Sequence, residues 1–205
     1  RTGIMAGSPC PIKTMYDVSE KMNMHDIVIV FGQTEAAPGC TMTTTEDSLE
    51  TRCATVGKAF PGVECKIVDP NTGETLPAGE IGEFCARGYN IMKGYYKMPE
   101  ATAQAIDKDG WLHTGDMAIK DANGNIFIKG RCKNMLLTAS GQNIYPEEIE
   151  ARLNNMPYVN ESLVILKENK LVALVYPDNE DAFSQGMNKK QLEEALELNR
   201  IELNK

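Results

Sequence analysis

Five consecutive residues at the end of an apolar run carry groups that could bind a ligand. They are Phe31, Gly32, Gln33, Thr34 and Glu35. Together they offer an aromatic plane, a flexible glycine, a hydroxyl donor and a carboxylate. The β-branched residues 27–30 before them predict a strand buried on both faces, as in a parallel sheet. Because ligands of open α/β sheets bind at the carboxyl ends of strands, the pattern predicts a binding site at residues 31–35.

A second loop is expected at the same edge of this sheet. Residues 2–6 read as a short strand. A helix is predicted after them from apolar residues at helical spacings, namely Ile12, Met15, Tyr16 and Met22. Strand, helix and strand form a right-handed crossover with parallel strands, so the loop at residues 7–9 and the loop at residues 31–35 would share one pocket. Read locally, residues 7–9 are also an ordinary turn before a helix.

A further polar group follows an aromatic segment later in the chain. Asp116 ends the segment GWLHTGD, where a Thr-Gly turn delivers a carboxylate that can accept from two neighbouring hydroxyls, as a ribose offers. The alternative is a tight turn capped by this aspartate. Trp111 and His113 are interpreted as packing or surface residues. Arg131 and Lys133, by local sequence alone, are an exposed basic pair.

Composition excludes several classes of protein. The chain has 205 residues and a net charge of −8, which argues against nucleic-acid binding. No apolar run approaches the roughly 18 residues of a membrane span, and no signal peptide is evident. Six scattered cysteines without a CxxC pair, and only two histidines, argue against a zinc site or a disulfide framework. Reduced thiols and a cytoplasmic location are the expectation.

The remaining sequence predicts a β-rich segment followed by a small α+β segment. Residues 41–50 are Thr-rich and read as a surface loop, and short strands with turns from residue 54 predict a small β-barrel or a distorted sheet. Other expected elements are strands at residues 62–68 and 80–88, a helix at 99–105, a hairpin at 117–129, a helix from Pro146, strands at 162–166 and 171–176, and a final helix containing Leu192, Ala195, Leu196 and Leu203.

These segments resemble, in order, the motifs of the AMP-forming adenylating enzymes, which include acyl-CoA synthetases, luciferases and peptide-synthetase adenylation domains. The overall run is most similar to medium- and long-chain fatty acid CoA ligases. Asn134 departs from the family pattern, in which an acidic residue is common. The matching segments are FGQTE at 31–35, GEIGEFCARG at 79–88, GYYKMPEAT at 94–102, GWLHTGD at 110–116, GRCKN at 130–134 and SGQNIYPEEIE at 140–150.

The resemblance implies a fold of two parts. Residues 1–130 would end a large α/β adenylating domain, made of a parallel βαβ unit and a small β-barrel. Residues 131–133 would be a hinge, and residues 134–205 an incomplete, mobile α+β domain. The family's phosphate loop and its PxTxxGK segment with the catalytic lysine do not occur in this sequence. We therefore expect a piece of a protein roughly twice this size or more, inactive by itself.

The resemblance also implies roles for individual residues. Thr34 and Glu35 would be catalytic, with Thr34 donating to the α-phosphate of ATP and Glu35 binding Mg²⁺. Lys133 would be the hinge residue, and Gly141 would let the pantetheine arm of CoA pass close to the backbone. The other implied nucleotide contacts are Gly7, Ser8, Phe31, Gly32, Gln33, Asp116 and Arg131.

The implied reaction joins a carboxylic acid to CoA through an acyl-adenylate. The expected small molecules are ATP, Mg²⁺, CoA and a fatty or similar acid whose chain length the sequence does not determine. A homodimer is left open. Two alternatives also stay open, an adenylation domain that loads a carrier protein and a non-catalytic nucleotide-binding relic.

Overall fold

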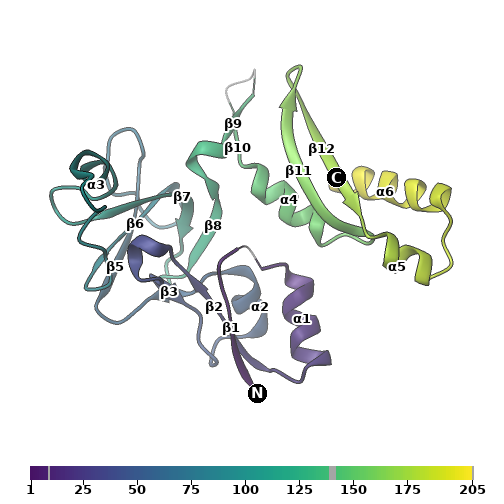
Figure 1. Ribbon diagram of the computed structural model, residues 1–205, viewed down its shortest axis with the longest axis horizontal. Coiled ribbons are helices and arrows are strands. Elements are labelled where there is room, and N and C mark those ends of the chain that lie inside the picture. The colour runs from purple at the N-terminus through teal and green to yellow at the C-terminus, as the bar shows by residue number, and fades with distance from the viewer. Residues whose placement is uncertain (9, 139–141, 205) are drawn as a thin grey trace. The chain divides into compact units, whose positions relative to one another are not determined.

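The computed structural model describes residues 1–8, 10–138 and 142–204. The chain divides into two compact units, Arg1–Lys133 and Asn134–Lys205, which we call unit 1 and unit 2. Each unit contains its own helices and sheets (Figure 1). The division falls next to the expected hinge at residues 131–133, and rotation of the backbone there stays a prediction. None of the helices in the described ranges is long and apolar enough to cross a membrane.

Unit 1 begins with the predicted crossover. Strands β1 (Thr2–Met5) and β2 (Asp26–Phe31) pair in parallel, and helix α1 (Ile12–Lys21) connects them. Residues 27–29 of β2 are buried, as their β-branched side chains predicted. Because both strands run in the same direction, the loops that follow them leave the sheet at the same edge.

Helix α1 buries less of its apolar stripe than the spacing indicated. Met15 is fully buried, but Ile12 and Tyr16 remain 44% and 41% exposed. Met22 is the C-cap residue rather than part of the helix. The spacing of apolar residues therefore located this helix without identifying which of them pack inward.

The Thr-rich segment after β2 is a surface loop, as predicted, only over residues 44–48. It contains strand β3 (Thr41–Met42), antiparallel to β2, and helix α2 (Leu49–Ala54). Thr41 and Thr43 are fully buried. The Thr43 hydroxyl accepts from the N–H of Ile29 at 2.9 Å, and the Thr41 hydroxyl donates to a backbone carbonyl 2.7 Å away. A threonine can enter a core when its hydroxyl has a backbone partner, and composition does not reveal that partner.

The middle of unit 1 is an antiparallel sheet in the order β5-β6-β7-β8. Helix α3 (Pro99–Ala105) lies in the connection between β6 and β7, and β4 (Lys58–Ala59) pairs with β3. Among the described residues β5 and β8 do not pair with each other. The sheet is therefore open, which corrects the expected small β-barrel. Its strands are β5 (Val63–Val68), β6 (Ile81–Gly88), β7 (Leu112–Lys120) and β8 (Ile126–Arg131).

One hydrophobic core joins the end of β2 to this sheet. Ala36 and Cys40, from the loop after β2, are fully buried in it. Phe31 packs edge to face on Phe84 of β6, with 5.4 Å between the ring centroids and 85° between the ring planes. The other buried members come from the sheet and are Ile67, Ala86, Leu112, Ala118 and Ile126. The loop that follows β2 is thus anchored on both sides of residues 32–35.

Unit 2 combines helices with an antiparallel hairpin. Helix α4 (Pro146–Asn154) starts with Pro146 in its first turn and packs on strand β11 (Val159–Lys167), which pairs with β12 (Lys170–Pro177) (Figure 1). Helix α6 (Lys189–Leu203) begins with a capping box between Asn188 and Gln191 and also contacts α4. Smaller elements that the sequence did not indicate are β9 (Leu136–Leu137), β10 (Asn143–Ile144) and α5 (Asn179–Ser184).

Replacing Thr43 with valine should destabilise unit 1. The substitution keeps the side-chain shape but leaves the buried N–H of Ile29 without its acceptor, which costs about 1–3 kcal/mol. Urea unfolding of the wild type and variant measures this difference. Thr45→Val is the matched control because Thr45 is exposed, and it should change the unfolding free energy by less than about 0.5 kcal/mol. Equal loss in both variants would contradict a buried role for the Thr43 hydroxyl.

Candidate functional site

The loop after β2 turns back on itself around a glycine. The N–H of Cys40 donates to the carbonyl of Phe31 at 2.8 Å, and η1, a 3₁₀ helix over Thr34–Ala36, lies between them. A Cβ on Gly32 would overlap the carbonyl of Pro38. Gly32 therefore has a steric reason to be glycine, independent of any ligand.

Helix η1 presents the two predicted catalytic residues. Thr34 is exposed and Glu35 is partly buried. The Tyr95 hydroxyl donates to Oε1 of Glu35 at 2.7 Å, and the N–H of Met92 donates to the Glu35 carbonyl at 2.8 Å. The bond to the carboxylate raises the pKa of the Tyr95 phenol, which therefore stays protonated as a donor. Sequence reasoning had treated residues 94–102 as structural and missed Tyr95, because its partner lies 60 positions away.

The segment that carries Tyr95 also holds the returning arm of the loop. Asn90 donates through Nδ2 to the carbonyls of Ala36 and Gly39, at 3.1 and 2.7 Å. These two bonds pair one carbonyl at the end of η1 and one in the chain that follows it. Residues 90–95 thus contact the loop after β2 through backbone and side chains.

Asp116 lies inside β7, at a β-bulge. The register of β6 against β7 shifts between Glu83 and Cys85, and Gly115 has a φ of 72°. This corrects the prediction of a Thr-Gly turn after a strand, since the positive φ of glycine here serves a bulge within the strand. Asp116 itself is only 5% exposed.

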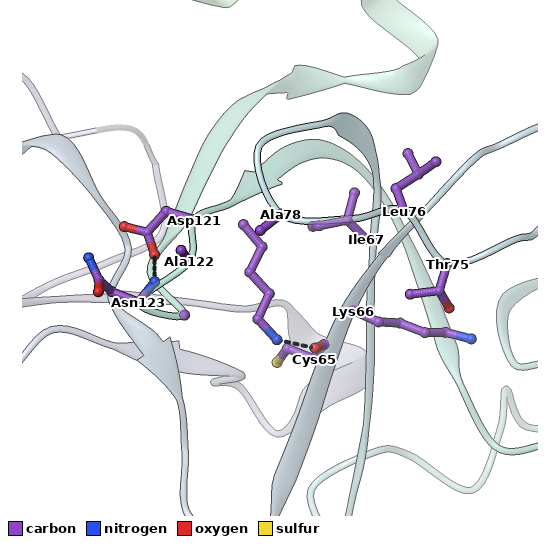
Figure 2. A pocket seen from close by; sticks show the side chains of 11 residues that line it. Cys65, Lys66, Ile67, Thr75, Leu76, Ala78, Asp121, Ala122 and Asn123 are labelled. Atoms are coloured by element: carbon purple, nitrogen blue, oxygen red, sulfur yellow. Dashed lines mark hydrogen bonds between the residues drawn. The ribbon is translucent and has the colours of Figure 1, made fainter.

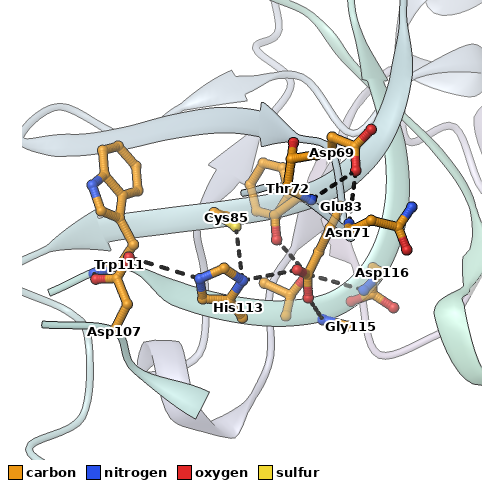
Figure 3. A network of polar contacts seen from close by, with 12 residues as sticks. Asp69, Asn71, Thr72, Glu83, Cys85, Asp107, Trp111, His113, Gly115 and Asp116 are labelled. Carbon is orange, nitrogen blue, oxygen red and sulfur yellow. Dashed lines mark hydrogen bonds and ion pairs between the residues drawn. The ribbon is translucent and has the colours of Figure 1, made fainter. Parts of the chain in front are cut away.

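A hydrogen-bonded network supports the bulge (Figure 3). The Thr114 hydroxyl donates to a backbone carbonyl of β6 at 2.7 Å and accepts from the N–H of Asp116 at 3.1 Å. Glu83 accepts from the N–H of Gly115 at 3.0 Å, and its other oxygen lies 2.8 Å from Nδ1 of His113. His113, expected to be a packing or surface residue, therefore belongs to the polar support of Asp116.

Trp111 packs, as expected, and its contacts include two cations. The Lys66 ammonium lies 4.3 Å from the centroid of its ring system and the Arg87 guanidinium 4.5 Å. Such contacts stabilise a partly exposed indole without giving it a catalytic group.

Strand β8 brings Arg131 to Asp116. The two residues are cross-strand partners, and Nη1 of Arg131 lies 2.8 Å from Oδ1 of Asp116. The Asp116 side chain is 8% exposed, whereas that of Arg131 is 49% exposed. The structure thus brings together the two residues predicted to hold a ribose. Their contact with a nucleotide stays a prediction.

Cys40 links the loop after β2 to Asp116. Its N–H is bonded to the Phe31 carbonyl, and its side chain is fully buried. Burial raises the pKa of the Cys40 thiol to about 11, and the negative charge of Asp116 adds to the shift. Cys40 also shares a hydrophobic core with Leu112 and Ala118 of β7, so the loop after β2 packs against the strand that carries Asp116.

Two groups among the described residues could hold a metal ion. Glu35 offers one carboxylate, the kind of ligand that Mg²⁺ takes singly or in pairs while keeping several waters. Glu83, Cys85 and His113 place one ligand atom each within 4.8 Å of one another. Burial raises the pKa of the Cys85 thiol to about 12. Cys85 and Glu83 both already contact Nδ1 of His113. We interpret this second group as part of the support for the bulge.

A surface pocket lies elsewhere in unit 1 (Figure 2). Its volume is about 470 Å³, and its walls come from β5, the segment after it and the β7–β8 turn. The Lys120 ammonium donates to the Cys65 carbonyl across it, at 3.1 Å. None of the predicted site residues lines this pocket, so it carries no argument about the site.

The other predicted residues have less structural context. Gly7 and Ser8 follow β1 at the shared sheet edge, and both are exposed. Gln33 is the residue before η1 and is partly buried. Lys133 is exposed in η2 (Cys132–Asn134), at the end of unit 1. Gly141 lies outside the described residues. The roles of all these residues stay predictions.

Comparison with known proteins agrees with the order of the sequence motifs. A family model described as AMP-binding enzyme matches residues 1–96. The chain is 52% identical over 165 residues to YngI of Bacillus subtilis (strain 168), which is named as an acyl-CoA synthetase, with 80% of this chain and 30% of that protein covered. It is 38% identical over 172 residues to the mitochondrial medium-chain acyl-CoA ligase ACSF2 of Bos taurus, with 83% of this chain and 28% of that protein covered.

A solved structure shares the fold. ATP-bound MatB from Rhodopseudomonas palustris aligns with a TM-score of 0.76 and 32% sequence identity, over 95% of this chain and 38% of that one. The fold and the matched sequence thus place the chain in the class of adenylate-forming, AMP-binding proteins. The chain belongs to the family of AMP-binding acyl-CoA ligases. It spans about 30% of the length of the curated relatives that it matches.

Alkylation should report the environment of Cys40. With a folded pKa of about 11, its thiolate fraction at pH 8 is small, and reaction with iodoacetamide should be about 100-fold slower than in the unfolded chain. The rate should rise as the pH increases from 8 to 11, while in urea it should level off near pH 9. Mass spectrometry of the labelled peptide measures both. Equal rates in the folded and unfolded protein would contradict burial of Cys40 beside Asp116.

Proposed function

We propose that the protein is an ATP-dependent acid–CoA ligase acting on a fatty acid. The carboxylate of the acid attacks the α-phosphorus of ATP, and pyrophosphate leaves, which forms an acyl-adenylate. The thiol of CoA then attacks the acyl carbonyl, loses its proton and displaces AMP, which forms the thioester. Because the acid and ATP are both anionic, the protein must contribute mainly positioning and groups that offset negative charge.

The observation that carries this proposal is one hydrophobic core shared by the loop after β2 and strand β7. Ala36 and Cys40, in the loop that contains Thr34 and Glu35, are packed with residues of β7, the strand that carries Asp116. A nucleotide needs donors for its phosphate and an acceptor for its ribose in one place. Groups suited to both are therefore found in one compact unit of this chain.

Different residues would contact different parts of ATP. The Thr34 hydroxyl is exposed and free to point at the α-phosphate, and Asp116, held by Arg131, would accept from the ribose hydroxyls. Gly7, Ser8, Gln33 and the partly buried ring of Phe31 would line the adenine and its surroundings. Phe31 is held by its perpendicular contact with Phe84, which fixes the orientation of the ring.

A magnesium ion fits the residues present. Glu35 is a partly buried carboxylate that uses one oxygen for Tyr95, so the second oxygen can serve as a ligand while water and phosphate supply the rest. When bound, the ion would offset charge on the phosphates. Glu35 would keep it beside η1.

The second half-reaction requires an acceptor and a rearrangement. We propose that backbone rotation at Lys133 brings the loop of Gly141 toward the adenylate, where a glycine leaves room for a pantetheine arm. The division of the chain at residues 133 and 134 supports a hinge at this point.

The medium-chain ligase among the relatives supports a fatty acid as the substrate. Its name also places that relative in mitochondria. The cytoplasmic location that we propose for this protein is supported by its net charge and its free cysteines.

The proposal is tested by carboxylate-dependent exchange between ATP and pyrophosphate in the full-length protein, with a panel of acids and subsequent addition of CoA. Exchange followed by thioester formation supports the ligase and identifies the acid. Exchange without CoA transfer would point to a carrier-loading adenylation domain. Absence of both in a folded protein would overturn the proposal in favour of a nucleotide-binding relic.

Glu35→Gln should reduce the exchange rate by about 100-fold or more, because the neutral amide is a poor ligand for Mg²⁺. Glu46→Gln is the control, since Glu46 is an exposed glutamate of the same unit and should keep the wild-type rate. The rates are measured at saturating ATP and acid. A wild-type rate in Glu35→Gln would remove Glu35 from the metal site.

Asp116→Ala should mainly raise the KM for ATP, by about 10-fold or more, because two charge-assisted hydrogen bonds to the ribose would be lost. Asp109→Ala, which removes an exposed carboxylate, should leave this KM unchanged. Thermal unfolding of both variants distinguishes lost binding from lost folding. A wild-type KM in a folded Asp116→Ala protein would exclude the ribose contact.

A further inference from the structure

Tyr95 contacts the residue to which the proposed function assigns the metal. Its hydroxyl donates to Oε1 of Glu35 at 2.7 Å. Tyr95 belongs to the long connection between β6 and β7, whereas Glu35 follows β2. Hydrogen bonds to a carboxylate are among the stronger ones in proteins, so this contact can set the direction of the Glu35 side chain.

Tyr95 is itself fixed from the other side. Its N–H donates to Oγ1 of Thr102 at 2.9 Å, and that hydroxyl donates to the carbonyl of Met98 at 2.9 Å. Thr102 lies in α3 and approaches the chain at Gly94, where a Cβ would come within 2.7 Å of the Thr102 side chain. A continuous series of contacts therefore runs from α3 through Tyr95 to Glu35.

The backbone around Glu35 is held by the same connection. Met92 donates to the Glu35 carbonyl, and Asn90 donates to the carbonyls of Ala36 and Gly39. These bonds place the backbone of η1, but they do not determine where the Glu35 carboxylate points. Within the described part of the chain, the Tyr95 hydroxyl alone donates to that carboxylate from a side chain.

We infer that Tyr95 is a positioning residue that holds Oε1 of Glu35 and leaves Oε2 for a divalent cation. This inference rests on the proposed function, because that function supplies the cation. A carboxylate held through one oxygen presents the other in a defined direction, so the ion binds without the cost of ordering the side chain first. The segment that we had interpreted as purely structural would thus act on the metal through Glu35.

The test compares Tyr95→Phe with Tyr96→Phe in the full-length protein. Both variants remove one phenolic hydroxyl, but Tyr96 is 86% exposed and lies beside Lys97. The rate of exchange between ATP and pyrophosphate is measured against the concentration of free Mg²⁺. Tyr95→Phe should raise the Mg²⁺ concentration for half-maximal rate about 3- to 10-fold, and Tyr96→Phe should leave it unchanged.

Two further measurements separate positioning from a general structural effect. Since the Tyr95 side chain is near the surface, Tyr95→Phe should keep the wild-type Tm within about 2 °C and the wild-type KM for the acid. Binding of Mn²⁺ in the presence of ATP, followed by electron paramagnetic resonance, should be about 3- to 10-fold weaker in Tyr95→Phe than in Tyr96→Phe.

The outcomes distinguish this inference from the proposed function. Active wild-type protein with an unchanged Mg²⁺ requirement in Tyr95→Phe would overturn the role of Tyr95 and leave the ligase standing. A loss of exchange activity in Tyr95→Phe at every Mg²⁺ concentration, with a lower Tm and a higher KM for the acid, would contradict the positioning role. Tyr95 would then have only a structural role. Inactive wild-type protein would overturn the proposed function, and equal Mn²⁺ affinity in the two variants would then overturn the positioning role as well.

Discussion

The site depends on the burial of the residues that follow Thr34 and Glu35. Ala36 and Cys40 are fully enclosed in a core that also contains Leu112 and Ala118 of β7. Moving the loop would expose this apolar surface to water, so the two polar side chains are held at a defined place on an otherwise flexible turn. The same core carries the strand in which Asp116 lies, and one packing arrangement therefore places both parts of the site.

Around this core, several buried polar side chains are paired with backbone groups. The Thr43 hydroxyl accepts from a backbone N–H of β2, and the Thr114 hydroxyl donates to a backbone carbonyl of β6. Arg52, only 7% exposed, donates to the carbonyls of His25 and Ile27, at the start of β2. An unpaired polar group in such a place would cost about 1–3 kcal/mol. These pairs explain how a segment rich in threonine can lie inside the unit, which its composition alone did not indicate.

Patterns that depend on neighbours in sequence were predicted well. The β-branched run at residues 27–30, the proline at the start of α3 and the turn at Gly124 all led to elements that the structure contains. Predictions that depended on partners far away in sequence failed more often. The threonines of residues 41–43 were assigned to the surface, Asp116 was assigned to a turn, and His113 was not connected with Glu83.

The sequence by itself determined the longer helices and strands, the order of the family motifs and the identity of the polar residues in them, because propensity and motif spacing are local properties of the chain. Only the tertiary structure decided which groups support those residues. It paired Asp116 with Arg131, set Glu83 and His113 under the bulge and brought Tyr95 to Glu35. Such partners are selected by strand register and by packing across 60 positions of chain, and neither leaves a local mark in the sequence.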